Sequence, residues 1–73
     1  MLVFNDTLDE HVLQTEYLTW ARDWSMGKTP LRFGQHICNK YLVLGKSAPD
    51  IFYAENVGDA YWKIVDVLVK QES

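Results

Sequence analysis

Two residues with catalytic potential, His36 and Cys38, lie close together in the chain. A histidine that activates a cysteine thiol must come within hydrogen-bond reach of it. The surrounding residues have helical spacing, and residues two positions apart on a helix differ by about 200° in direction. Cys38 falls on the apolar side, where a cysteine usually packs as a small hydrophobic residue. We therefore predict that Cys38 is a packing residue and that the two do not form a catalytic pair.

Metal and phosphate sites lack their usual signatures. A structural zinc site needs about four ligands at suitable spacing, but the chain has one cysteine and two histidines, His11 and His36. Neither a Cys-x-x-Cys nor a His-x-x-x-His pattern is present, and the glycines form no phosphate-binding loop. A lone cysteine excludes an internal disulfide and suits a reducing compartment. The sequence predicts a protein that is not an enzyme and uses no metal or cofactor.

Residues 29–45, TPLRFGQHICNKYLVLG, carry a polar arc with side chains able to contact base edges: Arg32, Gln35, His36, Asn39 and Lys40. Together with the following turn and Ser47, this stretch faintly resembles a helix-turn-helix. The segment in the recognition position is apolar and acidic, however, and its Asp50 and Glu55 would repel phosphates. We expect no autonomous DNA binding. A DNA-binding repressor stays open as an alternative, as does RNA contact by the arc within a larger complex.

The elements that position these residues are predicted to be helices. Thr7 and Glu10 match a capping box, and Gly27 is a natural helix stop. These signals place a first helix at about residues 8–26. Its apolar stripe has helical spacing and consists of Leu13, Tyr17, Trp20 and Trp24.

A second helix is predicted to start at Thr29 as N-cap, with Pro30 in its first turn, and to end at Gly45. Ser47 and Asp50 then match another capping box. This capping box opens a single helical turn, SAPDIFY, whose apolar residues are expected to pack on the core. These residues are Ile51, Phe52 and Tyr53.

A last helix is predicted to open at Asn56 and Asp59, although its β-branched residues make a strand at 64–69 the competing interpretation. Its apolar face consists of Ala60, Tyr61, Ile64, Val65 and Leu68. The predicted fold is all-α: a compact three-helix domain with an extra short helical turn, spanning residues 1–73. Residues 1–6 either fold back onto this core or form an extended arm.

Length and composition limit the class of protein. A chain of 73 residues allows one domain, and its 48% of hydrophobic residues favours a folded core. The start, MLVFNDT, has no basic region of a signal peptide. No apolar run approaches the roughly 20 residues that a membrane span needs. We expect a cytoplasmic protein without membrane contact.

The net charge of −3 hides an uneven distribution. Residues 1–27 carry five acids and one base, residues 28–49 carry four bases and no acid, and residues 50–73 carry five acids and two bases. A free-standing nucleic-acid-binding domain is usually basic overall. Segments of opposite charge instead suit a partner that is itself patchy, such as a large protein surface.

The run RFGQHICNKYL, with DIFYAE downstream in an aromatic-rich chain of 73 residues, resembles sequences of short phage proteins. Over its whole length the chain is similar to the small phage-encoded transcription regulators of the Xanthomonas phage type, which bind host bacterial RNA polymerase. The resemblance implies binding to the polymerase β and β′ subunits. It also implies inhibition of transcription initiation through loss of the σ factor, and antitermination near the RNA exit channel.

Three groups of residues are predicted to contact a partner. The acidic group could meet a basic segment of one subunit and consists of Asp6, Asp9 and Glu10. The basic group could face an acidic loop or the emerging RNA and consists of Lys28, Arg32, Lys40 and Lys46. The apolar anchor consists of Leu2, Val3 and Phe4, since charge steers an encounter while apolar burial holds it. A second alternative is an inhibitor of a different bacterial complex that binds through the acidic segments.

Overall fold

The computed structural model describes residues 2–72, with the side chains of residues 2–71. Its elements are α1 (Glu10–Ser25), α2 (Phe33–Tyr41), the short α3 (Pro49–Phe52) and α4 (Val57–Glu72). Residues 2–72 contain no strand, which confirms the predicted all-α fold of three helices and one helical turn. Residues 1 and 73, the ends of the predicted domain, lie outside the described part.

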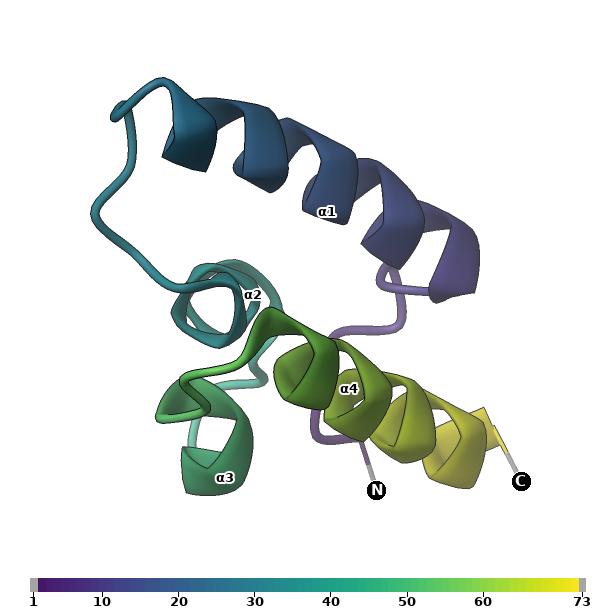
Figure 1. Cartoon of the computed structure of the whole chain (residues 1–73). Coiled ribbons are helices and arrows are strands. Elements are labelled where there is room, and N and C mark those ends of the chain that lie inside the picture. The colour runs from purple at the N-terminus through teal and green to yellow at the C-terminus, as the bar shows by residue number, and fades with distance from the viewer. Residues whose placement is uncertain (1, 73) are drawn as a thin grey trace.

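Helix α2 lies at the centre of the molecule. In Figure 1 it is viewed nearly along its axis, while α1 runs above it and α4 lies below. Helix α1 packs on α2, and α2 packs on both α3 and α4. The core between them holds Phe4, Leu8, Leu13, Trp20, Phe33, Ile37, Cys38, Ile51, Ala60, Ile64 and Leu68.

Helix α1 begins later than predicted, and the capping box of Thr7 and Glu10 is wrong. Asp9 is the N-cap, and its Oδ1 accepts a hydrogen bond from the backbone N–H of Val12 at 2.8 Å. A turn closed by the Leu8 N–H on the Asn5 carbonyl precedes the cap. The reason is burial: this turn places the Leu8 side chain in the core, at 3% exposure, and keeps Thr7 outside the helix.

Helix α2 is shorter than predicted at both ends. Thr29 and Pro30 belong to an extended linker, which is held by a 2.7 Å hydrogen bond from Trp20 Nε1 to the Leu31 carbonyl. The cap is Arg32, whose N–H donates to the Gln35 side chain. The helix stops at Tyr41 rather than Gly45 because the next residues pair with the start of the chain instead of continuing the helix.

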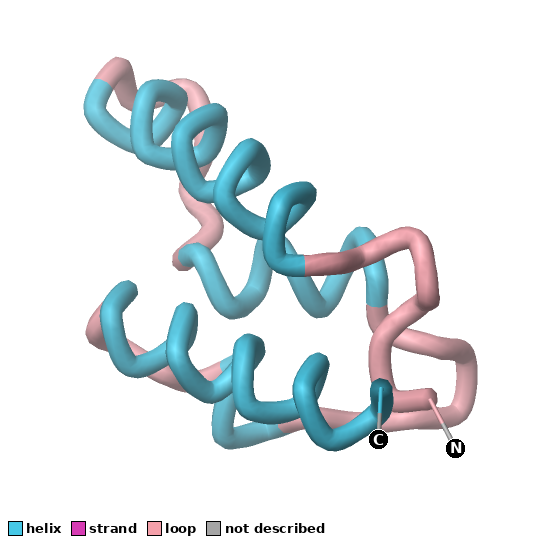
Figure 2. Tube along the Cα trace, turned by 90° about the vertical axis from the view of Figure 1, so that its right-hand side faces the viewer, coloured by secondary structure: helices cyan, strands magenta, loops and turns pink. Residues whose placement is uncertain are grey.

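The first residues fold back onto the domain. Phe4 forms an isolated antiparallel bridge with Leu42 and is completely buried. The side chain of Gln71 accepts hydrogen bonds from the N–H groups of Val3 and Phe4 and donates one to the Phe4 carbonyl, each at 3.1 Å. Residues 3–5 are therefore not an extended arm, and Figure 2 shows the start of the described chain beside the end of α4. Residue 1 of the predicted arm lies outside the described residues.

The short turn and the last helix follow the prediction in part. The N-cap of α3 is Ala48 without a side-chain hydrogen bond, so the capping box of Ser47 and Asp50 is wrong. Ile51 is buried and Phe52 half-buried, but Tyr53 is 70% exposed because it follows the end of α3. The predicted opening of the last helix at Asn56 is confirmed, since its Oδ1 accepts from the N–H groups of Gly58 and Asp59.

Gly34 allows α2 and α3 to approach closely. A Cβ at this position would lie 1.9 Å from the backbone oxygen of Ile51. No helix within residues 2–72 has the length and apolar character needed to cross a membrane.

Candidate functional site

The polar arc of α2 faces a carboxylate that the sequence analysis did not single out. Glu16 of α1 is only 9% exposed, and its carboxylate contacts three side chains of α2. Glu16 and these partners, His36, Lys40 and Tyr41, are called the Glu16 cluster below. Its Oε1 lies 2.9 Å from His36 Nε2, and its Oε2 accepts hydrogen bonds from Lys40 Nζ at 2.6 Å and from the Tyr41 hydroxyl at 2.5 Å. Two sequence signals could have pointed to this cluster: Glu16 lies beside the apolar stripe of α1, and His36 and Lys40 lie one turn apart on α2.

These contacts fix the charge of Glu16. Burial by itself raises the pKa of the Glu16 carboxyl, but the hydrogen bonds from Lys40, Tyr41 and His36 outweigh it and lower the pKa from 4.5 to about 2. The hydrogen bond to Glu16 in turn raises the pKa of Lys40. Glu16 is therefore ionised at neutral pH, and the cluster joins α1 to α2 as a charged interhelical contact.

The two residues with catalytic potential, His36 and Cys38, lie on different sides of α2. His36 faces Glu16, while Cys38 on the other side of α2 is buried at 4% exposure, and burial raises the pKa of its thiol. The prediction that Cys38 packs in the core is confirmed. Within the described residues, no group of three or more histidine, cysteine, aspartate or glutamate side chains is arranged to hold a metal ion.

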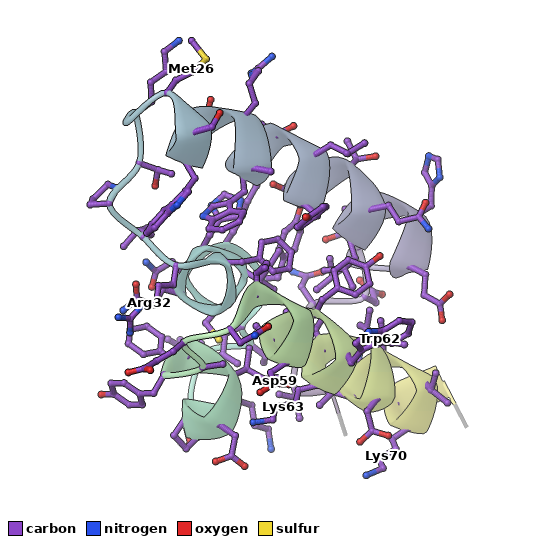
Figure 3. All side chains as sticks on the ribbon, viewed as in Figure 1. Met26, Arg32, Asp59, Trp62, Lys63 and Lys70 are labelled. Atoms are coloured by element: carbon purple, nitrogen blue, oxygen red, sulfur yellow. The ribbon has the colours of Figure 1, made fainter. Side chains whose placement is uncertain are left out.

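The four basic residues predicted to contact a partner do not form one continuous surface. Lys40 forms an ion pair with Glu16, although its side chain is 55% exposed. Lys28 is exposed after the turn that ends α1, Arg32 is exposed at the N-cap of α2, and Lys46 is half-buried in the loop before α3. Figure 3 shows Arg32 at the edge of the molecule, next to the start of α2.

The apolar and acidic groups differ in their availability. Phe4 is part of the core and cannot anchor a partner while the domain is folded, so that part of the prediction is wrong. Val3 is half-buried and Leu2 is 38% exposed. The acidic group of Asp6, Asp9 and Glu10 is exposed around the start of α1.

A groove between α1 and α4 is the surface feature that sequence reasoning missed. It encloses about 390 Å³ and is lined by Gln14, Tyr17, Leu18, Val57, Gly58, Tyr61 and Trp62; it is called the α1–α4 groove below. None of these side chains is charged. Leu18 and Trp62 are 68% and 69% exposed, so large apolar side chains border the groove on both helices. Figure 3 shows Trp62 on the side of α4 that faces α1.

An aromatic cluster connects α1 and α4 at this edge. The rings of Tyr17 in α1 and Tyr61 in α4 meet edge to face at 5.9 Å between centroids. Phe33 of α2 contacts both, at 5.6 Å from Tyr17 and 6.1 Å from Tyr61. Ring pairs in such geometries add to the stability of packing, and they connect α1, α2 and α4 beside the groove.

Two other hollows have charged linings. One, of about 550 Å³, lies on the α3 side of α4 and includes Asp50, Lys63 and Asp66. The other, of about 190 Å³, lies beside Trp24 and includes Arg32 and Glu55. The α1–α4 groove is the least polar of the three. The chain matches no protein-family model, no curated protein and no solved structure.

Proposed function

We propose that this chain is a non-enzymatic phage protein that binds host RNA polymerase in the bacterial cytoplasm and inhibits transcription initiation. The observation that supports binding of a protein is the α1–α4 groove, with Leu18 and Trp62 exposed on its borders. Tryptophan and tyrosine are enriched among the residues that dominate protein–protein interfaces. The choice of polymerase as the partner rests on the resemblance of the sequence to small phage transcription regulators.

The proposed mechanism is steric and allosteric. The protein occupies a surface of the β and β′ subunits that productive σ-dependent initiation requires, and the σ factor is lost from the promoter complex. The acidic group is exposed around the start of α1, while the exposed bases Lys28 and Arg32 lie between α1 and α2, away from that group in the chain. Charge of this kind raises association rates and selects orientation.

Antitermination is the second part of the proposal. It places Lys28 and Arg32 near the emerging RNA within the assembled complex, where polymerase offsets the acidic charge of the chain. The structure offers little for an autonomous DNA-binding repressor, because α3 has only four residues and its Ile51 is buried. A short turn committed to the core cannot enter a major groove as a recognition helix.

The test uses purified core RNA polymerase and σ factor from a Xanthomonas host. We expect the chain to bind the core enzyme and to reduce abortive transcription from a σ-dependent promoter. Trp62→Ala should weaken binding at least about tenfold, whereas Tyr53→Ala, which removes an equally exposed ring away from the groove, should leave it unchanged. If the unaltered chain does not bind polymerase, the proposal is wrong.

A further inference from the structure

We propose that the α1–α4 groove is a docking site for an amphipathic α-helix of a partner protein, one that places apolar side chains in the groove and a lysine or arginine at the Glu10 end. This inference rests on the proposed function only in that the chain acts by binding another protein. It specifies the kind of segment that the groove takes.

The backbone around the groove favours a helical occupant over an extended one. Both walls are helices, α1 and α4, whose backbone hydrogen bonds are made within each helix. An extended peptide binds by adding a strand to an exposed sheet edge, and the only β-pairing within residues 2–72 is the Phe4–Leu42 bridge. A helix satisfies its own backbone groups and needs only side-chain contacts.

The apolar surface is long enough for about three turns of such a helix. On α4 it continues past the groove, because Gly58, Trp62, Val65 and Val69 follow one another at spacings of four, three and four residues. These spacings place them in one stripe, and Val69 is 51% exposed. At a rise of 1.5 Å per residue, the stripe extends over about 16 Å.

Charge sets the orientation of the occupant. Glu10 lies one turn before Gln14 on α1, which puts it on the same face at one end of the groove. Asp6 and Asp9 are also exposed near this end, and no ion pair to any of the three is found within the described residues. The nearest base on α1, Arg22, is at the opposite end and adjoins Asp23. A cation of the partner would therefore be attracted to the Glu10 end.

The probe is a set of synthetic 16-residue amphipathic peptides with leucine at helical spacing and two lysines at either the first or the last turn. Peptides of the same pattern with glutamate in place of lysine serve as the charge control. Binding to the isotope-labelled full chain is followed by NMR through the Trp62 indole signal. We expect lysine peptides of one polarity to bind most tightly, with shifts confined to the groove residues.

Two variants locate the site. Leu18→Lys places a charge in the groove at an already exposed position and should weaken peptide binding at least about tenfold. Leu44→Lys makes the same change at a fully exposed position outside the lining and should have no effect. Glu10→Lys should reverse the preference, so that glutamate peptides bind more tightly than lysine peptides.

Three outcomes would overturn the inference: no peptide binding at millimolar concentration, equal binding to Leu18→Lys, or concentration-dependent dimers that shift the same groove signals. The last would mean that a second copy of the chain covers the groove. Absence of peptide binding by a chain that still binds polymerase would overturn this inference while leaving the proposed function standing. Conversely, if the chain binds the helical peptides but does not bind polymerase, the proposed function is refuted and this inference stands.

Discussion

At the scale of single residues, Glu16 is the only charged side chain buried among the described residues. Removing a charge from water is unfavourable unless hydrogen bonds and opposite charges replace the lost hydration. His36, Lys40 and Tyr41 provide those contacts. The polar arc that could have contacted nucleic acid is therefore used in part to hold α1 against α2.

Glu16→Gln should destabilise the domain by about 2 kcal/mol, because the neutral amide loses the charge-assisted hydrogen bonds and leaves Lys40 and Tyr41 poorly matched. Urea unfolding followed by circular dichroism measures the change. Glu55→Gln makes the same substitution at an exposed position and should change the free energy of unfolding by less than about 0.5 kcal/mol. Equal stability of the two variants would show that the Glu16 cluster does not hold the helices together.

The low pKa of Glu16 predicts how stability depends on pH. The folded-state pKa of about 2 lies below the ordinary value of 4.5, so the group binds protons less readily when the chain is folded. Its contribution, about 3 kcal/mol from the difference of pKa values, is complete above pH 4.5 and is lost as the pH falls towards 2. Urea unfolding of the unaltered chain between pH 6 and 2 should show this loss. Glu16→Gln should show a shallower dependence over the same range, and an unchanged slope would contradict the assignment.

At the scale of elements, Gly34 determines how closely α2 and α3 pack. Gly34→Ala would place a Cβ 1.9 Å from the Ile51 carbonyl oxygen and 2.9 Å from its carbon, which are backbone atoms that cannot rotate away. We expect a loss of about 3 kcal/mol, larger than the roughly 1 kcal/mol that alanine gains over glycine in a helix. Thermal unfolding should show a lower midpoint.

Gly58→Ala is the matched control for this effect. Its Cβ would meet only the Oδ1 of the Asn56 side chain, at 3.1 Å, which can move by a few tenths of an ångström. The variant should remain within about 1 kcal/mol of the unaltered chain. If Gly34→Ala is as stable as Gly58→Ala, then α2 and α3 can move apart without a loss in the free energy of unfolding.

At the scale of the whole molecule, the first and last segments close the fold together. Gln71, near the end of α4, hydrogen-bonds the backbone of Val3 and Phe4, and Phe4 fills the core beside α2. The core therefore includes residues near both ends of the described chain, Phe4 and Leu68. Opening of the core should be largely a cooperative event, as is usual for small single domains.

Cys38 offers a measure of that opening. Because its thiol is 4% exposed and burial raises its pKa, a thiol reagent should label it only when the core opens. Labelling of the native chain should be at least about 100-fold slower than labelling of the urea-unfolded chain. Gly34→Ala should accelerate it. Labelling of the native chain at the unfolded rate would show that Cys38 is not protected by the core.

Local sequence signals were sufficient to predict the class of fold. The helical spacing of Leu13 and Trp20 in α1, and of Ile64 and Leu68 in α4, correctly predicted helices with buried faces. The opposite directions of His36 and Cys38 also followed from helix geometry alone. These predictions depend on residues within a few turns of one another, so periodicity determines them.

The ends of the helices, the partners of Glu16 and the α1–α4 groove were decided only by the tertiary structure. Lys40 lies 24 residues from Glu16, and Gln71 lies 67 residues from Phe4. Competing contacts of this kind end α2 at Tyr41 and keep Thr7 outside α1. The sequence by itself determined that the chain forms helices and roughly where each one lies, because helix formation depends on near neighbours. Their packing, and with it the groove, depends on contacts between distant segments that no local pattern encodes.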